Sequence, residues 1–362
     1  MNRSQRSTRG NTLGRARRPL DAALALAFVL LLPLPVAAQG ASGAPAGSSS
    51  SETTGAATEI VATVGMIGDV AEAVAGGCAN VTSLMGPGTD PHLFRASAGD
   101  VQALQRADLI LFGGLGLEGR LADVLESFAA RKPAVAVSEA AVPEELRLAG
   151  QSGYAIDPHV WMDVSLWTGV ADVVAAAIAA LPDVDPACAA EAAERASAYR
   201  AQLEALHDWA AAAVATVPEE RRVLVTAHDA FHYFGRAYDI EVVGVQGVST
   251  ESEAAVADIR RVAEVVVTRG IPAVFVESTI NPRTVQAVVE AVRQRGASVT
   301  LGDALYADAM GASGTPDGTY IGMLIHNVRA IVMALGGAAP DLPAALAPWL
   351  ERFEVAEAGG AP

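Results

Sequence analysis

The sequence predicts an α/β protein of two lobes, each a mainly parallel sheet flanked by helices, joined by one long rigid linker helix. Apolar strand-like runs alternate with helical patterns over residues 59–184 and again over 219–340, and such alternation is typical of parallel sheets covered on both faces. Between the two series, residues 186–217 form an alanine-rich stretch with no internal Gly or Pro. The chain of 362 residues also exceeds the size at which a single core usually stops growing.

The first part of the chain precedes the expected fold. Residues 1–38 combine an arginine-rich stretch with an apolar run and two small residues, Ala37 and Ala38, which is typical of a cleavable signal peptide. The apolar run is short for a membrane-spanning helix and is interrupted by two prolines. Residues 39–58 are rich in Gly, Ala, Ser and Thr and predict a flexible linker. No cysteine lies near the cleavage site to carry a lipid, so we expect export to the periplasm as a free protein.

The first lobe is expected over residues 59–184 and the connecting helix over 185–218. Strands are predicted at 59–64, 80–84, 109–112 and 134–137, and helices at 70–75, 98–106, 119–130 and 164–181. Residues 138–156 contain Pro and Gly and predict a loop. At 1.5 Å per residue the connecting helix would span about 45 Å, which is longer than one small domain.

The second lobe is expected over residues 219–340, followed by an Ala/Pro-rich tail at 341–362. Strands are predicted at 222–226, 241–245, 273–277 and 298–301, and helices at 229–238, 253–269, 282–295 and 319–335. The two lobes therefore resemble each other in layout, although not in sequence.

Charge and cysteine content limit the function classes. The chain has 41 acidic and 25 basic residues and a formal net charge of −16, which disfavours nucleic acid as a partner and attracts cations. Its two cysteines, Cys78 and Cys188, would reach an oxidising compartment. A disulfide needs Cα atoms within about 7 Å of each other, and the sequence leaves open whether this pair meets that condition.

An Asp-Pro-His tripeptide occurs twice, at residues 90–92 and 157–159. The proline restricts the backbone before the histidine, and the nearby carboxylate is placed to hold the second ring nitrogen. His92 and His159 are therefore candidate pre-oriented metal ligands. The alternative is two unrelated loops that each carry a surface histidine.

Further histidines occur in the second half of the chain. His228 lies just past the carboxyl end of an expected strand, where open α/β sheets bind ligands. His232 follows four residues later and is placed to share a helical face with it, although a supporting or surface role is the favoured interpretation. His207 and His326 are expected to pack or to face solvent.

Three carboxylates near later strand ends are candidates for a fourth ligand: Glu277, Asp303 and Asp308. Their spacing does not separate them. Any one would complete a site of three histidines and one carboxylate, which suits Zn²⁺, Mn²⁺ or Fe²⁺, whereas an all-oxygen site would suit Ca²⁺ or Mg²⁺.

Catalytic motifs give little support to an enzyme. The chain has no His-Glu-x-x-His helix and no Gly-x-Ser-x-Gly turn, and its Gly-rich stretch at 113–116 lacks both the dinucleotide-binding spacing and the phosphate-loop lysine. A zinc hydrolase remains an alternative, and it would need an open coordination position for water. A surface adhesion protein is a second alternative, but it gives the repeated tripeptide no role.

Six ordered segments carry a resemblance to a known family, at residues 83–92, 157–163, 227–231, 247–253, 275–278 and 314–320. In these segments the chain resembles the manganese- and zinc-binding solute-binding proteins of ABC importers, the TroA-like group. The resemblance implies two α/β lobes joined by one long helix, which would allow only small lobe movements. It also implies that His92 and His159 from the first lobe, and His228 and Asp308 from the second, bind the metal, with Asp308 preferred over Asp303.

The resemblance further implies a function. The protein would capture one divalent metal ion as transported ligand and deliver it to the membrane permease of an ABC importer, as a monomer and without catalysis. Since the His-rich loop of many zinc binders is absent, manganese is favoured and zinc is a close second, because the Irving–Williams order favours zinc in vitro. His232 departs from the family pattern, which has a small or aromatic residue there.

Overall fold

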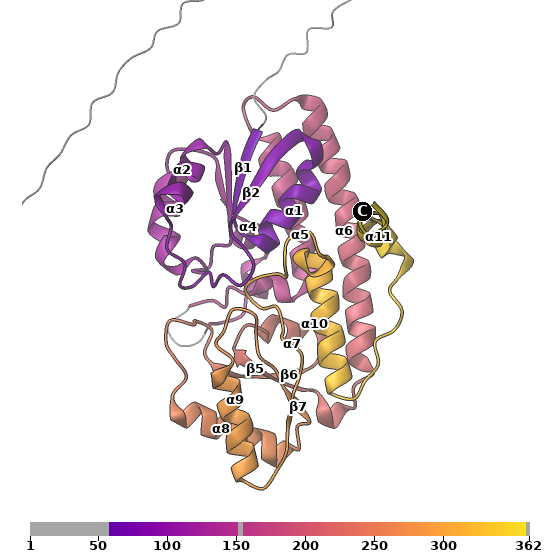
Figure 1. The fold of residues 1–362 in the computed structure, drawn as a ribbon. Coiled ribbons are helices and arrows are strands. Elements are labelled where there is room, and N and C mark those ends of the chain that lie inside the picture. Colours follow the sequence, from indigo (N-terminus) through magenta and orange to yellow (C-terminus); the bar gives the residue numbers. More distant parts are fainter. Residues whose placement is uncertain (1–57, 151–154, 360–362) are drawn as a thin grey trace, which may run out of the picture. The chain divides into compact units, whose positions relative to one another are not determined.

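The computed structural model describes residues 58–150 and 155–359, and it confirms the predicted α/β fold of two lobes joined by a long helix (Figure 1). The predicted signal peptide and nearly all of the predicted linker lie outside the described residues. Within the described part of the chain, none of the helices combines the length and the apolar character needed to cross a membrane.

The N-terminal lobe contains one sheet of four parallel strands in the order β2-β1-β3-β4. The strands are β1 (Thr58–Val64), β2 (Ala79–Met85), β3 (Leu109–Phe112) and β4 (Ala134–Ala136). Val61 of β1 pairs with Thr82 on one side and Ile110 on the other. As expected of a central parallel strand, β1 is buried from Ile60 to Val64.

Helices cover both faces of this sheet, with α1 and α5 on one side and α2 and α3 on the other (Figure 1). Their bounds are α1 (Gly65–Ala75), α2 (Ala98–Arg106), α3 (Ala122–Ala129), α4 (Val137–Ala141) and α5 (Val164–Ala179). Two differ from expectation: α1 begins earlier than predicted, and α4 occupies part of the predicted loop. The early part of α1 includes Gly68, which permits close packing, because a β-carbon there would collide with the Ser83 side chain of β2.

The predicted connecting helix is present as α6 (Pro186–Ala215), with 30 residues. The Asp185 side chain accepts a hydrogen bond from the N–H of Ala187 and caps the helix, and Pro186 occupies the first helical position, where a missing N–H costs nothing. Its buried stripe includes Leu203, Leu206 and Trp209. A single apolar core runs from the first sheet through α5 and α6 into α10 (Tyr320–Ala334), so α6 is packed into the protein on one side.

The C-terminal lobe contains two pairs of parallel strands. They are β5 (Val223–His228) with β6 (Glu241–Gln246) and β7 (Ala273–Val274) with β8 (Thr300–Leu301), accompanied by α7 (His232–Tyr238), α8 (Val256–Arg269) and α9 (Arg283–Gln294). The N–H of Phe275 donates to the carbonyl of Val225 at 2.9 Å and joins the pairs. Both β7 and β8 are shorter than predicted. Beyond β7 the chain leaves the ladder and meets the segment after β8 again at a bridge between Glu277 and Leu305.

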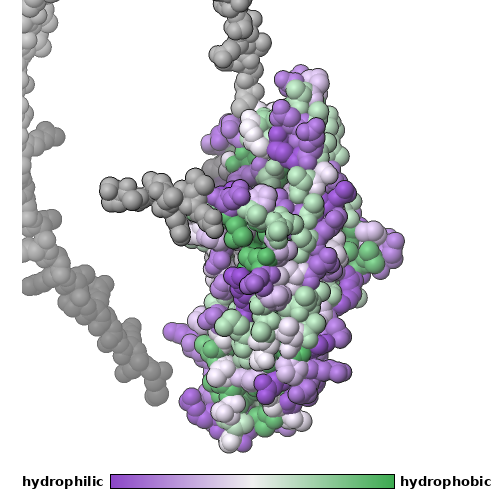
Figure 2. Space-filling model, turned by 90° about the vertical axis from the view of Figure 1, so that its right-hand side faces the viewer, coloured by the Kyte–Doolittle hydropathy of each residue, from purple (hydrophilic) through white to green (hydrophobic). Residues whose placement is uncertain are grey.

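Two further features connect other segments to α6 and to the start of α10. Cys78 and Cys188 form a disulfide with Cα atoms 5.7 Å apart, which answers the question that the sequence left open. The expected tail contains α11 (Ala347–Gly359), and Trp349 is buried and donates to Thr319 Oγ1 at 2.9 Å. On the face shown in Figure 2, strongly apolar residues form small groups among hydrophilic ones.

Candidate metal centre

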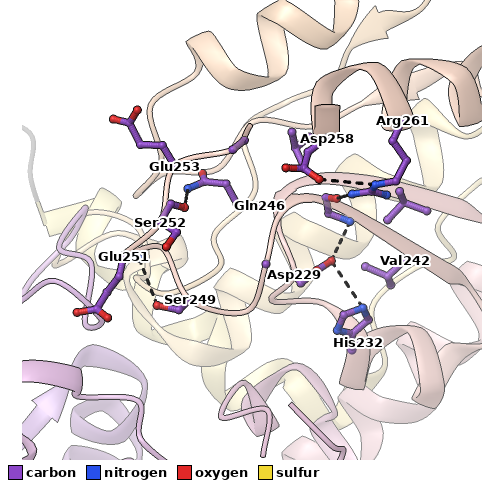
Figure 3. Close-up of a pocket in the computed structure, with 15 residues that line it drawn as sticks. Asp229, His232, Val242, Gln246, Ser249, Glu251, Ser252, Glu253, Asp258 and Arg261 are labelled. Carbon is purple, nitrogen blue, oxygen red and sulfur yellow. Dashed lines mark hydrogen bonds and ion pairs between the residues drawn. The ribbon is translucent and has the colours of Figure 1, made fainter. Parts of the chain in front are cut away.

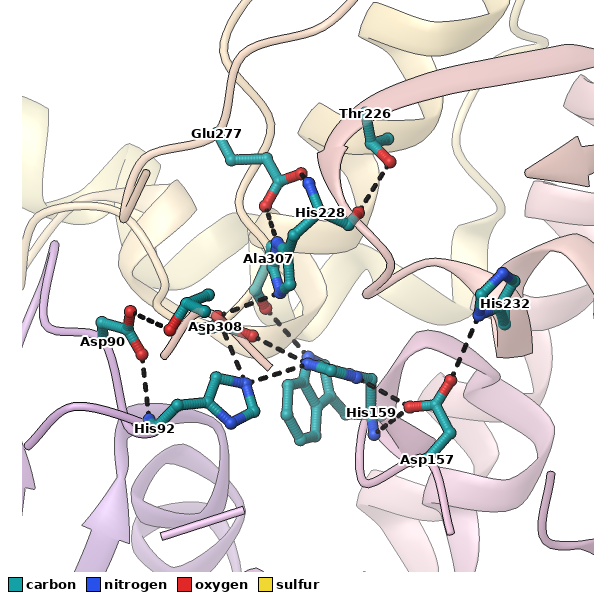
Figure 4. A network of polar contacts seen from close by, with 12 residues as sticks. Asp90, His92, Asp157, His159, Thr226, His228, His232, Glu277, Ala307 and Asp308 are labelled. Atoms are coloured by element: carbon teal, nitrogen blue, oxygen red, sulfur yellow. Dashed lines mark hydrogen bonds and ion pairs between the residues drawn. The ribbon is translucent and has the colours of Figure 1, made fainter. Parts of the chain in front are cut away.

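The four residues expected to bind metal lie together between the two lobes (Figure 4). His92 follows β2, and His159 immediately precedes a short 3-10 turn at Val160–Met162. His228 ends β5, and Asp308 lies in the loop after β8. None of the four is more than 1% exposed, and one donor atom from each lies within 4.8 Å of all the others. The fold thus brings residues from four separate segments to one buried point.

The spacing of these donor atoms suits a single small cation. The Nε2 atoms of His159 and His228 each lie 3.3 Å from an Asp308 oxygen. His92 Nε2 lies 3.4 Å from His159 Nε2 and 3.9 Å from Asp308 Oδ2. Four ligands arranged tetrahedrally around an ion, with bonds of about 2.1 Å, are separated by about 3.4 Å. The cluster therefore matches a four-coordinate divalent ion with only small adjustments.

The repeated tripeptide forms the same local turn twice. In each copy the aspartate Oδ1 accepts a hydrogen bond from the backbone N–H of the histidine two residues later, at 2.9 Å for His92 and 3.0 Å for His159. Asp157 Oδ1 also accepts from His159 Nδ1 at 2.7 Å, as the sequence argument expected. Asp90 uses its second oxygen differently, because Oδ2 accepts from Thr250 Oγ1 of the other lobe at 2.6 Å.

The carboxylates that the sequence left as alternatives occupy three different settings. Glu277 accepts from the backbone N–H of His228 at 2.9 Å and contacts its ring Nδ1, so it orients that histidine. Asp303 is exposed, and Asp308 faces the three histidines. Because His159 and His228 donate their Nδ1–H groups to carboxylates, their Nε2 atoms are left to accept a metal ion.

Several buried polar atoms of this cluster have no hydrogen-bond partner among the described residues: His228 Nε2 and both carboxylate oxygens of Asp308. Buried polar groups are nearly always paired, and each exception needs an explanation. A divalent cation at the centre of the cluster would satisfy all three atoms together.

Burial and the carboxylates act in opposite directions on the histidine pKa values. Burial disfavours the charged ring and lowers the pKa of His92 to about 4. It opposes protonation of His159 as well, but the carboxylates of Asp157 and Asp308 outweigh it and raise that pKa to about 9. The pKa of His228 is likewise raised well above its usual value, despite burial, by its glutamate partner and Asp308. Burial would raise the pKa of Asp308, but the two charged histidines hold it well below its usual value.

His232 lies beside the cluster without joining it. Its Nδ1 is 3.5 Å from Asp157 Oδ2 and its Nε2 is 3.7 Å from Asp229 Oδ1. The side chain is one-quarter exposed and lines an open pocket of about 670 Å³ (Figure 3). The contact with the Asp157 carboxylate is the main cause of the raised pKa of His232. His232 thus supports the carboxylate that orients His159, while His207 and His326 lie outside the cluster.

Sequence reasoning missed two contacts that cross between the lobes. Trp161 Nε1 donates to the carbonyl of Ala307 at 2.9 Å, next to Asp308, and its ring centroid lies 5.2 Å from that of His159. The second contact is the hydrogen bond from Thr250 to the Asp-Pro-His loop of the first lobe. Trp161 and Thr250 both lie in segments that carry the family resemblance, but no local spacing could reveal their partners.

Two α/β lobes joined by a long helix, with a buried cluster of three histidines and a carboxylate between them, define the class of metal-binding solute-binding proteins. Residues 60–334 match the family described as zinc-uptake complex component A, periplasmic (ZnuA), and the chain belongs to this family.

Comparison with individual proteins agrees with this assignment. The chain is 43% identical over 278 residues to the manganese-binding lipoprotein MntA of Bacillus subtilis (strain 168), covering 76% of this chain and 89% of that protein. It is 45% identical over 276 residues to the zinc-binding protein TroA of Treponema pallidum (strain Nichols), covering 76% and 88%. The solved structure of the periplasmic zinc-binding protein TroA from Treponema pallidum has a TM-score of 0.74 to this fold at 44% identity, covering 77% of this chain and 99% of that one.

These findings confirm the predicted family and function. The chain is a metal-binding solute-binding protein of the kind that serves an ABC-type importer. The family is one of transport proteins, and the hydrolase and adhesion alternatives find no support in the comparisons.

Proposed function

We propose that His92, His159, His228 and Asp308 bind one divalent metal ion, with two ligands from each lobe, and that the protein holds this ion as cargo. The observation that carries the proposal is the convergence of four buried donor atoms within 4.8 Å of one another. The Asp308 carboxylate supports it, because it is buried among the three histidine rings and supplies the anionic oxygen donors that a divalent ion binds.

We propose Mn²⁺ as the delivered ion and Zn²⁺ as its strongest competitor. Imidazole and carboxylate donors bind both metals, and by the Irving–Williams order Zn²⁺ binds more tightly than Mn²⁺ in vitro, whichever ion the cell delivers. The printed names of two relatives point to the same pair, manganese for MntA and zinc for TroA. Uptake of each metal, supplied alone to cells that lack the gene and to complemented cells, tests this choice. Equal manganese uptake in both strains would overturn it.

The partner that fits this role is the membrane permease of an ABC importer, which would receive the ion from a periplasmic, monomeric protein. The family description names a periplasmic component of an uptake complex. Cell fractionation tests the location, and sedimentation of the purified protein tests the monomer. Recovery in the cytoplasm, or a stable dimer, would contradict the respective part of the proposal.

Metal analysis of the purified protein tests the ligand set. We expect about one tightly held divalent ion per chain, and we expect His159→Ala to lose most of it. His207→Ala is the matched control, because His207 lies on α6 outside the cluster. Full metal retention by His159→Ala, or equal loss by both variants, would overturn the assignment.

A further inference from the structure

One short loop of the C-terminal lobe reaches across to the N-terminal lobe beside the metal cluster. We call residues 247–252, which follow β6, the clasp loop. Thr250 Oγ1 donates to Asp90 Oδ2 at 2.6 Å in a partly buried hydrogen bond, and Thr250 itself is only 7% exposed. The next residue, Glu251, places Oε1 3.6 Å from Arg120 Nε in an exposed ion pair.

The hydrogen bond from Thr250 ends on the residue that holds His92. Asp90 accepts the Thr250 hydroxyl with one carboxylate oxygen and the backbone N–H of His92 with the other. Hydrogen bonds to a carboxylate are about twice as strong as neutral ones. A side chain of one lobe therefore fixes the backbone of a metal-site histidine in the other.

The ion pair leads to the same histidine by a second route. Arg120 belongs to the 3-10 turn Gly119–Leu121, and Gly119 packs so closely on the His92 carbonyl that a β-carbon there would lie 2.6 Å from the oxygen. Glu118, which is buried, accepts from the N–H of Gly113 and from Thr63 Oγ1 and anchors this turn to the sheet. The Gly-rich stretch at 113–116, which matched no nucleotide-binding motif, thus begins the segment that supports His92.

The clasp loop also carries its own internal bonds. Gln246 Nε2 donates to the carbonyl of Ser252 at 2.9 Å, and the N–H of Glu251 donates to Ser249 Oγ at 3.2 Å (Figure 3). Both bonds lie within the C-terminal lobe. Thr250 is therefore presented toward the first lobe by a loop that is already organised.

We propose that the clasp loop holds His92 in place only while the lobes are closed, with Thr250 as a positioning residue that sets how long the metal stays bound. The proposal rests on the proposed role of His92 as a ligand. When the lobes separate, the bond to Asp90 and the ion pair with Arg120 break together. His159 and His228 keep the carboxylates that orient them, because each partner lies in the same lobe as its histidine. The support of Asp90, and through it of His92, is then the one that loses a hydrogen bond from the other lobe.

Metal dissociation kinetics test the clasp. The protein is loaded with Zn²⁺ and mixed with excess chromogenic chelator in a stopped-flow instrument. Loss of one hydrogen bond to a carboxylate predicts that Thr250→Val releases metal about tenfold faster. Thr250→Ser keeps the hydroxyl and is expected to restore the slow rate. Thr300→Val is the matched control, because it removes a threonine hydroxyl that bonds to Pro272 within the C-terminal lobe.

A double variant tests whether Thr250 acts through Asp90. In an Asp90→Ala background, Thr250→Val is expected to add no further acceleration, and the unfolding midpoint of each metal-free variant excludes a general loss of stability. An unchanged rate in Thr250→Val, an equally fast Thr250→Ser, or additive effects in the double variant would overturn the clasp. His92→Ala separates the two proposals. If His92→Ala retains metal like the wild type, the proposed ligand set is wrong. If His92→Ala loses metal while Thr250→Val releases it at the wild-type rate, only the proposal for the clasp loop is wrong.

Discussion

Metal binding at neutral pH should release two protons from the protein. In the metal-free site His159, with a pKa raised to about 9, and His228, with a pKa raised well above its usual value, are both charged at pH 7. His92, with a pKa lowered to about 4, is neutral. In the proposed site a metal ion would take the Nε2 lone pairs, so the two charged rings would each give up a proton.

The charge of the site supports the same number. In the metal-free state the two charged histidines face the Asp308 carboxylate, whose pKa they hold well below its usual value. In the loaded state a divalent ion replaces the two protons and the net charge is the same. Metal binding thus replaces two protons by one divalent cation and leaves the net charge of the buried site unchanged.

The sign and size follow from proton linkage. Affinity falls as pH falls, because protons compete with metal for the same nitrogen atoms. Between the His92 pKa of about 4 and the His159 pKa of about 9, two released protons correspond to about a 100-fold change in dissociation constant per pH unit, or about 3 kcal/mol. Above that window the slope should flatten.

Calorimetric titration of the metal-free protein in buffers with different ionisation enthalpies measures the proton count at pH 7. The slope of observed enthalpy against buffer enthalpy should correspond to two protons per ion bound. A slope near zero would show that the metal-free histidines are already neutral, and it would refute the electrostatic reasoning while leaving the ligand set intact.

Three further predictions concern orientation, pH and the disulfide. Asp157→Asn should weaken metal binding about 10- to 100-fold, because an amide holds the His159 ring less well than a carboxylate does. Competition with a chelator measures the affinity. An unchanged affinity would count against the orienting role of Asp157. The metal-free protein should lose stability as pH rises, because the pKa of His159 is raised to about 9 in the folded state. The shift from the ordinary value of about 6.5 contributes about 3 kcal/mol to the free energy of unfolding, which is fully present below about pH 6.5 and is lost above about pH 9. Urea unfolding across this range measures it, and a flat profile would contradict the prediction. Replacing Cys78 and Cys188 by serine should lower the free energy of unfolding by about 2–4 kcal/mol. Metal affinity should not change, because the disulfide joins α6 to the turn after α1 and involves none of the cluster residues. Unfolding midpoints that match the wild type would contradict this.

Much of the fold was predictable because its determinants are local. The connecting helix is marked by Asp185 and Pro186 at its start and by the absence of Gly and Pro inside it. The central strands of both lobes are marked by short runs in which apolar residues dominate. The errors lie where packing overrides local preference. The helix α1 begins earlier than predicted and includes Gly68, which packs closely against β2 because it has no side chain. The strand β7 is shorter than its apolar run.

For the site, the sequence by itself determined the local turns and the kinds of donor available. Each Asp-Pro-His copy fixes a carboxylate on the backbone of its own histidine, because the two residues are neighbours in the chain. The tertiary structure alone decided which carboxylate faces the histidines, since Glu277, Asp303 and Asp308 all follow strands and differ only in where the folded loops direct them. It also decided the tie from Thr250 to Asp90, because a hydrogen bond between two lobes depends on how they pack and leaves no trace in the spacing of residues along the chain.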